Sequence, residues 1–181
     1  MLDFSIGILE FPNIAEGYKN IDYIMKQFSI STIKIQKICP GRLLFIFSAD
    51  TSDITNIMKE YKNNERKILY SSVTGISKEC IDSIAHRKNI SDFSDLGIIE
   101  VKNCVNTIKI ADMILKTSSS EILKIDMGLG LFGKGLIFFI GTISNIKSAI
   151  GAINANFSDN EIVSSEIISN PVDDFKKIFC C

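Results

Sequence analysis

Five cysteine thiols give this chain its widest range of possible chemistry. They stand at positions 39, 80, 104, 180 and 181. Their spacing fits neither a disulfide framework nor a Cys-x-x-Cys zinc site, so in a reducing compartment they would be free thiols or metal ligands. Cys39 is followed by Pro40, which fixes a backbone angle, and by Gly41, which permits a sharp turn. The sulfur of Cys39 could therefore project from the tip of a small turn.

Several interpretations of Cys39 are open from the residues alone. Lys37 and Arg42 flank the turn and could lower the thiol pKa or offset the negative charge of a thiolate bound to a metal. A plainer interpretation is a small residue at a strand end, in contact with solvent. A third is an opening lined by thiols that hold no ligand.

A second loop is rich in glycine. It contains Gly128, Leu129, Gly130, Leu131, Phe132 and Gly133. The loop follows a predicted strand, but its spacing gives neither the dinucleotide fingerprint nor Gly-Lys-Ser/Thr, because Gly135 follows Lys134. We therefore expect a compact loop that lets backbones crowd near an axis and shape an opening, not a phosphate site.

No catalytic arrangement can be argued from the sequence. His86 is the only histidine, and its neighbours Arg87 and Lys88 suggest an exposed helix end. Asp22 and Asp112 look like a carboxylate pair, but they occupy equivalent positions in two copies of one unit. We therefore predict that the protein is not an enzyme.

The elements that position these loops come from a tandem repeat. Gly7 recurs as Gly97 and Ile35 as Ile125, at a constant offset of 90 residues. Because one structural unit is used twice, function is expected where the copies differ, and the two loops are the sharpest difference. We predict two domains, residues 1–90 and residues 91–181, the second with a C-terminal tail.

Each copy shows the same order of predicted elements, from the alternating and helical spacing of its apolar residues. The predicted strands are 4–11, 31–38, 43–47, 67–73, 96–101, 121–127, 134–141 and 161–168. The predicted helices are 14–28, 53–62, 78–86, 105–118 and 144–156. Each copy is thus a β-α-β-β-α-β unit of the ferredoxin-like, α+β class. Such a sheet carries helices on one face, so we expect its other face and its edges to be free for assembly.

Composition sets broad limits on partners. The net charge of −1 does not favour nucleic acid. No apolar run reaches the roughly 18 residues of a membrane span, and the N-terminus lacks the pattern of a signal peptide. We expect a cytoplasmic protein without nucleic-acid or membrane partners.

Both copies resemble the shell domains of bacterial microcompartments. Gly-Ile-Leu-Glu at 7–10 and Gly-Ile-Ile-Glu at 97–100 resemble the first strand of that family, and segments 21–26 and 111–116 resemble its Ala-Asp-x-x-x-Lys helix. Two such domains in one chain resemble the tandem-domain class. The resemblance implies a structural shell protein whose homotrimer is a pseudohexamer. The trimer would tile with other shell proteins around encapsulated enzymes, with redox enzymes among the partners it allows.

The loops resemble more specifically those of the iron–sulfur trimeric shell proteins of propanediol-utilisation compartments. The matching segments are 37–42 and 126–134. The resemblance implies that Ile38, Cys39, Pro40 and Gly41 line a central pore with the glycine-rich loop. It also implies that Cys39 of three chains binds one [4Fe–4S] cluster per trimer, since one cysteine per chain cannot hold a cluster. The implied function is electron transfer across the shell; the alternative is a metal-free trimer whose pore passes small polar metabolites.

Two lysines and two connecting segments bear on assembly. Lys26 and Lys116 occupy the helix position that, in the family, contacts the adjoining tile; the alternative is a solvated lysine. The family's Pro-Arg-Pro-His segment is absent, and Thr74–Ser77 and Ser169–Val172 stand in its place. Corner contacts between tiles are therefore an open question.

The remaining apolar residues are expected to be structural. We predict that Cys80 and Cys104 are buried or half-buried apolar residues that fill space. We also predict a short amphipathic helix within residues 173–181, which would pack Phe175, Ile178 and Phe179 on its own domain. The alternative for this tail is a peptide that docks cargo, and no role is assigned to Cys180 and Cys181.

Overall fold

The fold consists of two four-stranded antiparallel sheets, one in each half of the chain. The computed structural model describes residues 5–62, 67–85, 92–128, 130–158 and 160–179. Sheet A has the strand order β2-β3-β1-β4, and sheet B has the order β6-β7-β5-β8. The first half contains β1 (Ser5–Phe11), α1 (Ile14–Gln27), β2 (Ser31–Ile38), β3 (Arg42–Ala49), α2 (Thr51–Lys62), β4 (Leu69–Val73) and α3 (Lys78–Ala85). The second half contains β5 (Asp95–Val101), α4 (Cys104–Thr117), β6 (Glu121–Met127), β7 (Gly135–Gly141), α5 (Ile143–Asn156), β8 (Ile162–Ser169) and α6 (Asp173–Lys176).

The two sheets have the same topology and the same register. Ile8 of β1 lies opposite Ile46 of β3, and its repeat equivalent Ile98 of β5 lies opposite Phe138 of β7. This arrangement confirms the predicted ferredoxin-like units, and the ends of their predicted strands and helices differ from the observed ones by at most two residues. His86, placed at the end of a helix by the sequence pattern, lies outside the described residues.

Helices α1 and α2 cover one face of sheet A. The aromatic residues Phe11, Phe45 and Phe47 are fully buried on this face, with the apolar side of α2. All seven residues of β1 are buried, including those that point to the opposite face. A strand buried on both sides needs a second covering layer, as in a sheet with helices on both faces.

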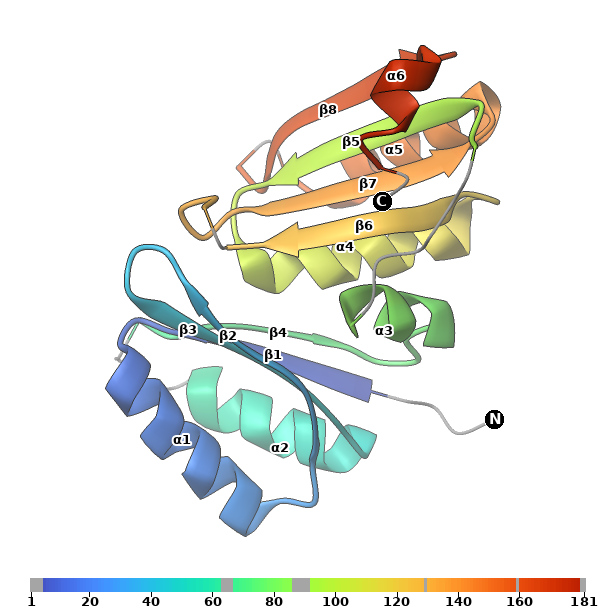
Figure 1. Cartoon of the computed structure of the whole chain (residues 1–181). Coiled ribbons are helices and arrows are strands. Elements are labelled where there is room, and N and C mark those ends of the chain that lie inside the picture. The colour runs from blue at the N-terminus through green and yellow to red at the C-terminus, as the bar shows by residue number, and fades with distance from the viewer. Residues whose placement is uncertain (1–4, 63–66, 86–91, 129, 159, 180–181) are drawn as a thin grey trace.

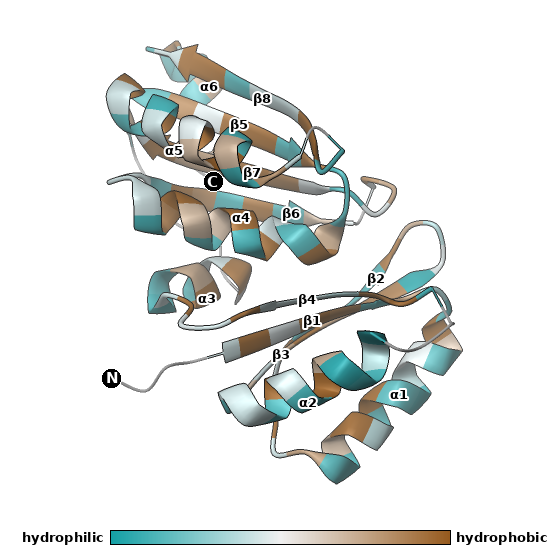
Figure 2. Cartoon of the chain, turned by 180° about the vertical axis from the view of Figure 1, so that it is seen from behind, coloured by the Kyte–Doolittle hydropathy of each residue, from teal (hydrophilic) through white to brown (hydrophobic). Residues whose placement is uncertain are grey.

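The second half of the chain supplies that layer, so the expectation that this face would be free is wrong for sheet A. Figures 1 and 2 show α3 and α4 between the two sheets. Ile6 and Ile8 belong to one apolar cluster with Val105 and Ile108 of α4. Removing this apolar surface from water is the main source of the free energy that stabilises the contact. The same buried surface joins the two halves of the chain.

Sheet B is covered differently on its two faces. Helices α4 and α5 cover one face, and the short α6 lies on the other (Figure 1), together with Phe93 and Phe179. Phe175 and Phe179 pack there against Phe138, with ring centroids 5.1 Å apart for Phe138 and Phe179. The predicted tail helix thus packs on its own domain, but it is shorter than predicted and Ile178 points outward, 63% exposed.

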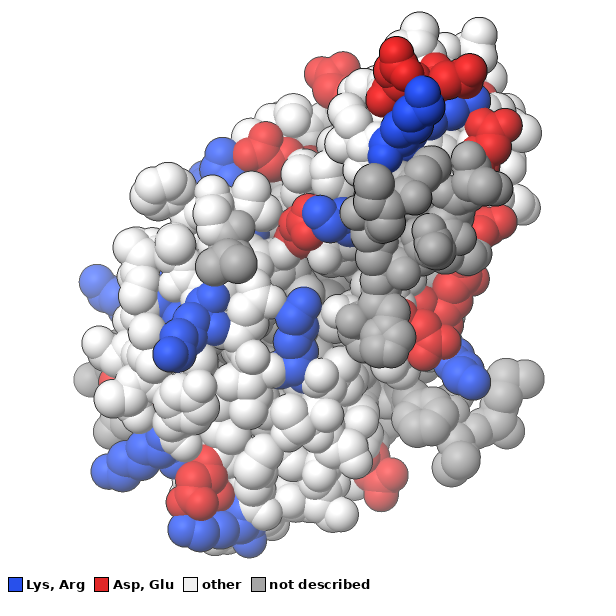
Figure 3. Space-filling view, in the orientation of Figure 1, with Lys and Arg blue, Asp and Glu red and all other residues white. Residues whose placement is uncertain are grey.

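Charged residues are spread over the surface. Figure 3 shows single Lys and Arg side chains among uncharged residues on one face, with acidic side chains near α6, whose first turn carries Asp173 and Asp174. Among the described residues, no helix has both the length and the apolar character that crossing a membrane would take.

Candidate functional site: two loops at one end of the chain

Cys39 lies at the tip of the hairpin between β2 and β3. Ile38 ends β2 and is buried, so it anchors the turn, while Cys39 beside it is half-buried and Pro40 is exposed. The Cys39–Pro40 peptide bond is cis, and Gly41 has a φ of +70°. Cys39 therefore stands on a short turn next to solvent, as predicted.

The glycine-rich loop between β6 and β7 closes on itself. Gly128 donates its N–H to the Lys134 carbonyl oxygen at 2.9 Å, and Lys134 donates to Leu131 at 3.0 Å. Gly130 has a φ of +72°, and Phe132, with a φ of +51°, is 79% exposed. The loop is therefore compact, as expected, and presents an aromatic ring to solvent; Leu129 lies outside the described residues.

The two loops contact each other although they come from different halves. The Cys39 N–H donates to the Gly128 carbonyl oxygen at 3.3 Å, and Gln36 Nε2 donates to the Met127 carbonyl oxygen at 2.7 Å. A Cβ on Gly128 would lie 2.3 Å from the side chain of Ile38, so only glycine allows this approach. Figure 1 shows both loops on the same side of the folded molecule. The sequence-predicted pore residues that are described therefore form one contiguous site.

An ion pair next to the loops changes the predicted role of Arg42. Its guanidinium donates to Glu10 Oε1 at 2.5 Å, and the Glu10 side chain is 1% exposed. The equivalent pair in the second half, Lys134 with Glu100, has an N···O distance of 2.7 Å and is more exposed. Because a carboxylate already neutralises Arg42, that residue does not offer a spare positive charge to Cys39; Lys37, on the exposed side of β2, is better placed to do so.

The other two described thiols are unsuited to bind a metal. Burial raises the pKa of Cys80 to about 12, with a further contribution from Asp112, and burial raises the pKa of Cys104 to about 12 as well. The Cys104 sulfur lies 3.2 Å from the Lys134 carbonyl oxygen. Both cysteines are buried structural residues, as predicted. Cys180 and Cys181 lie outside the described residues.

The residues at the hairpin tip fit a cluster shared between chains. Iron is bound by thiolates, and Cys39 is the described thiol that lies at the surface. Within the described part of one chain, no group of three Cys, His, Asp or Glu side chains could hold a metal ion. A cluster would therefore need Cys39 from several copies.

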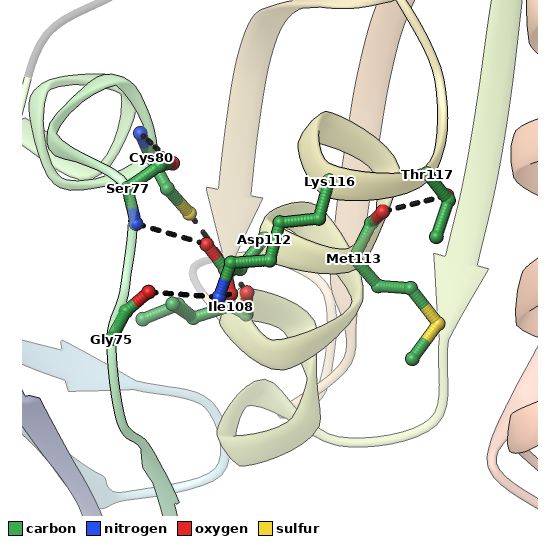
Figure 4. A network of polar contacts seen from close by, with 8 residues as sticks. All are labelled: Gly75, Ser77, Cys80, Ile108, Asp112, Met113, Lys116 and Thr117. Carbon is green, nitrogen blue, oxygen red and sulfur yellow. Dashed lines mark hydrogen bonds and ion pairs between the residues drawn. The ribbon is translucent and has the colours of Figure 1, made fainter.

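Lys116, predicted to contact an adjoining tile, makes contacts within the chain. Its Nζ donates to the Gly75 carbonyl oxygen at 2.8 Å and forms an ion pair with Asp112. Asp112 Oδ1 in turn accepts the Ser77 N–H at 3.1 Å (Figure 4). These bonds join α4 to the segment between β4 and α3. The tile-edge role of Lys116 stays a prediction.

Lys26 is the equivalent lysine of the first half. It pairs with Asp22 at 2.6 Å, and both side chains are more than 60% exposed (68% and 63%). Exposed pairs of this kind contribute little to the stability of the fold. Because both side chains are exposed, a partner could contact them. Its tile-edge role also stays a prediction.

A polar hollow lies beside the loops, between β2 and β6. Its volume is about 430 Å³, and its lining includes Lys34, Gln36, Lys124 and Asp126. Met127 and Leu131 connect this hollow with the glycine-rich loop.

Sequence reasoning missed the contact between the two halves. A signal was present: α4 carries Val105, Ile108 and Leu115 where α1 carries Ala15, Tyr18 and Met25. A helix apolar on two sides is typical of a buried helix, whereas α1 has one apolar side. Comparing the helices of the two copies could have predicted the covering of sheet A.

Comparisons with known proteins agree with this geometry. The BMC domain family matches residues 5–76 and 95–171. The bacterial microcompartment shell protein PduT of Citrobacter freundii is 24% identical over 148 residues, covering 81% of this chain and 80% of PduT.

Two solved structures share the fold. A microcompartment protein from Desulfitobacterium hafniense has a TM-score of 0.84 at 21% identity, covering 96% of this chain and 98% of its own. The fused permuted hexameric shell protein MSM0275 of the RMM microcompartment has a TM-score of 0.60 at 13% identity, with 84% of each chain covered.

Proposed function

The chain belongs to the BMC domain family and is a structural protein of a microcompartment shell, and we propose that three copies form a tile with one iron–sulfur cluster at its centre. The family is structural and not enzymatic, and its members form the shells of cytoplasmic microcompartments. The proposal adds the trimer, the cluster and electron transfer across the shell to that established role.

The contact between the two loops is the observation that carries the proposal. Cys39 and Gly128 are hydrogen-bonded on one side of the folded molecule, so each copy brings both loops to the same place. A ring of three copies, with this end at its axis, would gather three Cys39 thiolates. Its six domains would give the tile a hexagonal outline.

Cys39 of each chain would hold the cluster, and the group would supply one-electron chemistry at the centre of the tile. Ile38 and Gly128 keep the hairpin tip fixed relative to the second loop. Lys37 would offset negative charge near three thiolates. Phe132, exposed on the neighbouring loop, would limit the access of water to the opening.

The test combines mass and colour. Purified protein should have three times the chain mass of 20.1 kDa in native mass spectrometry. Anaerobic reconstitution with iron and sulfide should give the broad visible absorbance of an iron–sulfur cluster and four irons per trimer. Cys39→Ser should lose the iron, whereas the matched control Cys104→Ala should keep it.

A metal-free tile with a pore for small polar metabolites is the second candidate, and the polar hollow between β2 and β6 favours it. A wild-type trimer that stays colourless after reconstitution would support this candidate and exclude the cluster. Iron binding that survives Cys39→Ser would also contradict the proposed ligand.

A further inference from the structure

The polar hollow between β2 and β6 contains a positive charge that no carboxylate of its lining neutralises. Lys34 and Gln36 line it from β2, and Lys124 and Asp126 line it from β6. Lys124 forms an ion pair with Asp126 at 2.7 Å. Lys34 is half-buried, yet it forms no ion pair within the described part of the chain. The two lysines and one aspartate therefore leave one positive charge in excess, on the Lys34 side.

The hollow exists because two sheet edges approach each other. Strand β2 is at one edge of sheet A, and β6 is at one edge of sheet B (Figure 1). The Gln36 amide bridges the gap and donates to the Met127 carbonyl oxygen at 2.7 Å. The edges are thus held together at one place and leave about 430 Å³ beside it, a volume that is typical of sites for small molecules.

The sheet holds Lys34 at this hollow. Lys34 lies opposite Ile46 of β3, and Gln36 lies opposite Leu44. Residues that lie opposite each other on neighbouring strands share a face of the sheet, and on this face the second half of the chain buries Ile46 and Leu44 completely. Lys34 is therefore at the rim of a covered face. An ammonium that is partly removed from water attracts an anion more strongly than one in open solvent.

Apolar side chains form another part of the lining. Ile125 and Met127 of β6 are only 7% and 3% exposed, and Leu131 of the glycine-rich loop is half-buried. A short aliphatic chain on the ligand could lie against these three residues. The Asp126 carboxylate would repel a second negative group on the ligand. The lining therefore matches a molecule with one negative charge and a short apolar chain.

The lining is poorly suited to phosphate. Its described residues include no arginine, the side chain whose fork binds phosphate through two hydrogen bonds. They belong to β2, β6 and the loop after β6, so no helix N-terminus contributes backbone N–H groups. A carboxylate needs less, because one ammonium can form a charge-assisted hydrogen bond with it.

We infer that the hollow binds an organic monocarboxylate with a short aliphatic chain. Lys34 donates to the carboxylate, and the aliphatic chain contacts Ile125, Met127 and Leu131. Asp126 holds Lys124 at the opposite side of the hollow. The site lies within one chain, so it requires neither the proposed trimer nor the proposed cluster.

Butyrate titration followed by methyl NMR tests the site. The full chain is labelled in its methionine methyl groups, and Met127→Leu identifies the Met127 signal. Sodium butyrate should shift that signal in a saturable way, with a dissociation constant of about 0.1–10 mM for so small a ligand. The signal of Met58, which is buried on the other face of sheet A, should not move. A Met127 signal that does not respond to butyrate would overturn the inference.

Substitution of Lys34 tests its role. Lys34→Gln should raise the dissociation constant for butyrate at least about 10-fold, because the charged donor is lost. Lys34→Arg keeps the charge and should bind within about threefold of the wild type. The matched control Lys147→Gln, at an exposed lysine of α5, should bind butyrate as the wild type does. Wild-type affinity in Lys34→Gln would contradict the assigned contact.

Three further probes separate the parts of the ligand. n-Butanol has the chain without the charge, and sodium chloride has the charge without the chain, so each should give less than about a tenth of the butyrate shift. Inorganic phosphate should do the same. A phosphate or chloride shift as large as that of butyrate would show a general anion site and overturn the choice of ligand. These outcomes do not depend on mass or iron content, so they leave the proposed tile to its own test.

Discussion

The carboxylate of Asp112 accepts a hydrogen bond from the backbone N–H of Ser77, 3.1 Å away, and so ties α4 of the second half to the first half. The Asp112 side chain is 5% exposed. Its repeat equivalent Asp22 makes only a solvent-exposed pair with Lys26. The two aspartates therefore form a matched pair in which the same residue type has different surroundings.

Asp112→Ala should lower the free energy of unfolding by about 2–3 kcal/mol, because a buried charge-assisted bond is lost and the Ser77 N–H loses its acceptor. Asp22→Ala should change it by less than about 0.5 kcal/mol. Urea unfolding of both variants measures the difference. Equal effects would contradict the contact described for Asp112.

Gly128→Ala should lower the free energy of unfolding by about 2–4 kcal/mol. Its Cβ would overlap Ile38, 2.3 Å away, at a φ of +69°. Gly130 has a similar φ of +72° but no neighbour within 4 Å. Gly130→Ala should therefore cost only the backbone strain, about 1 kcal/mol. Thermal unfolding of both variants compares them, and a Gly130→Ala effect as large as that of Gly128→Ala would contradict the loop contact.

Thiol alkylation should distinguish the cysteines. In the native apoprotein at neutral pH, Cys39 should react with iodoacetamide, and Cys80 and Cys104 should react only after unfolding. Reactivity requires an accessible thiolate, and burial raises the pKa of both Cys80 and Cys104 to about 12. Peptide mass spectrometry measures each site, and rapid native labelling of Cys104 would contradict its burial.

The same pKa shifts predict how stability depends on pH. The fold favours the protonated thiols, so this contribution is complete below the ordinary pKa of 9.0 and is lost as the pH rises towards 12. Above pH 9 the free energy of unfolding should fall by about 1.4 kcal/mol per pH unit for each thiol. Cys80→Ala should remove one such contribution, so its unfolding free energy should fall less steeply; an unchanged slope would contradict the assignment.

The end of the chain offers another matched pair. Phe179→Ala should lower the free energy of unfolding by about 3 kcal/mol, because the ring is 8% exposed and contacts Phe93 and Phe138. Ile178→Ala should have little effect, since that side chain is 63% exposed. Urea unfolding compares the two, and similar losses would show that Ile178 also packs on sheet B.

The repeat made the fold predictable. Because each pattern occurs twice, the assignment of a segment as strand or helix is less ambiguous than it would be from one copy. The element order β-α-β-β-α-β then permits few topologies. The place of Cys39 was predictable too, because Pro40 and Gly41 mark a turn between two apolar runs. The pattern of apolar residues in one copy could not predict how the two halves of the chain pack on each other.

Two site features depend on contacts between residues far apart in the sequence. Arg42 looked like a counter-charge for Cys39, but the chain path brings its guanidinium to Glu10 of β1, which is distant in sequence. The contact between Ile38 and Gly128 joins residues 90 positions apart, and neither residue type marks it locally. Long-range contacts of this kind follow from the assembled fold and not from local preference.

Joining two copies in one polypeptide also has an evolutionary consequence for the two loops. Among six identical subunits, any loop mutation would be present six times, and a poor one would harm every position at once. Here the hairpin that carries Cys39 always meets a partner of different sequence, the loop that begins at Gly128. Each loop is thus free to diverge while the other preserves the contact, which is how a surface thiol and a glycine-rich loop can coexist in one gene product.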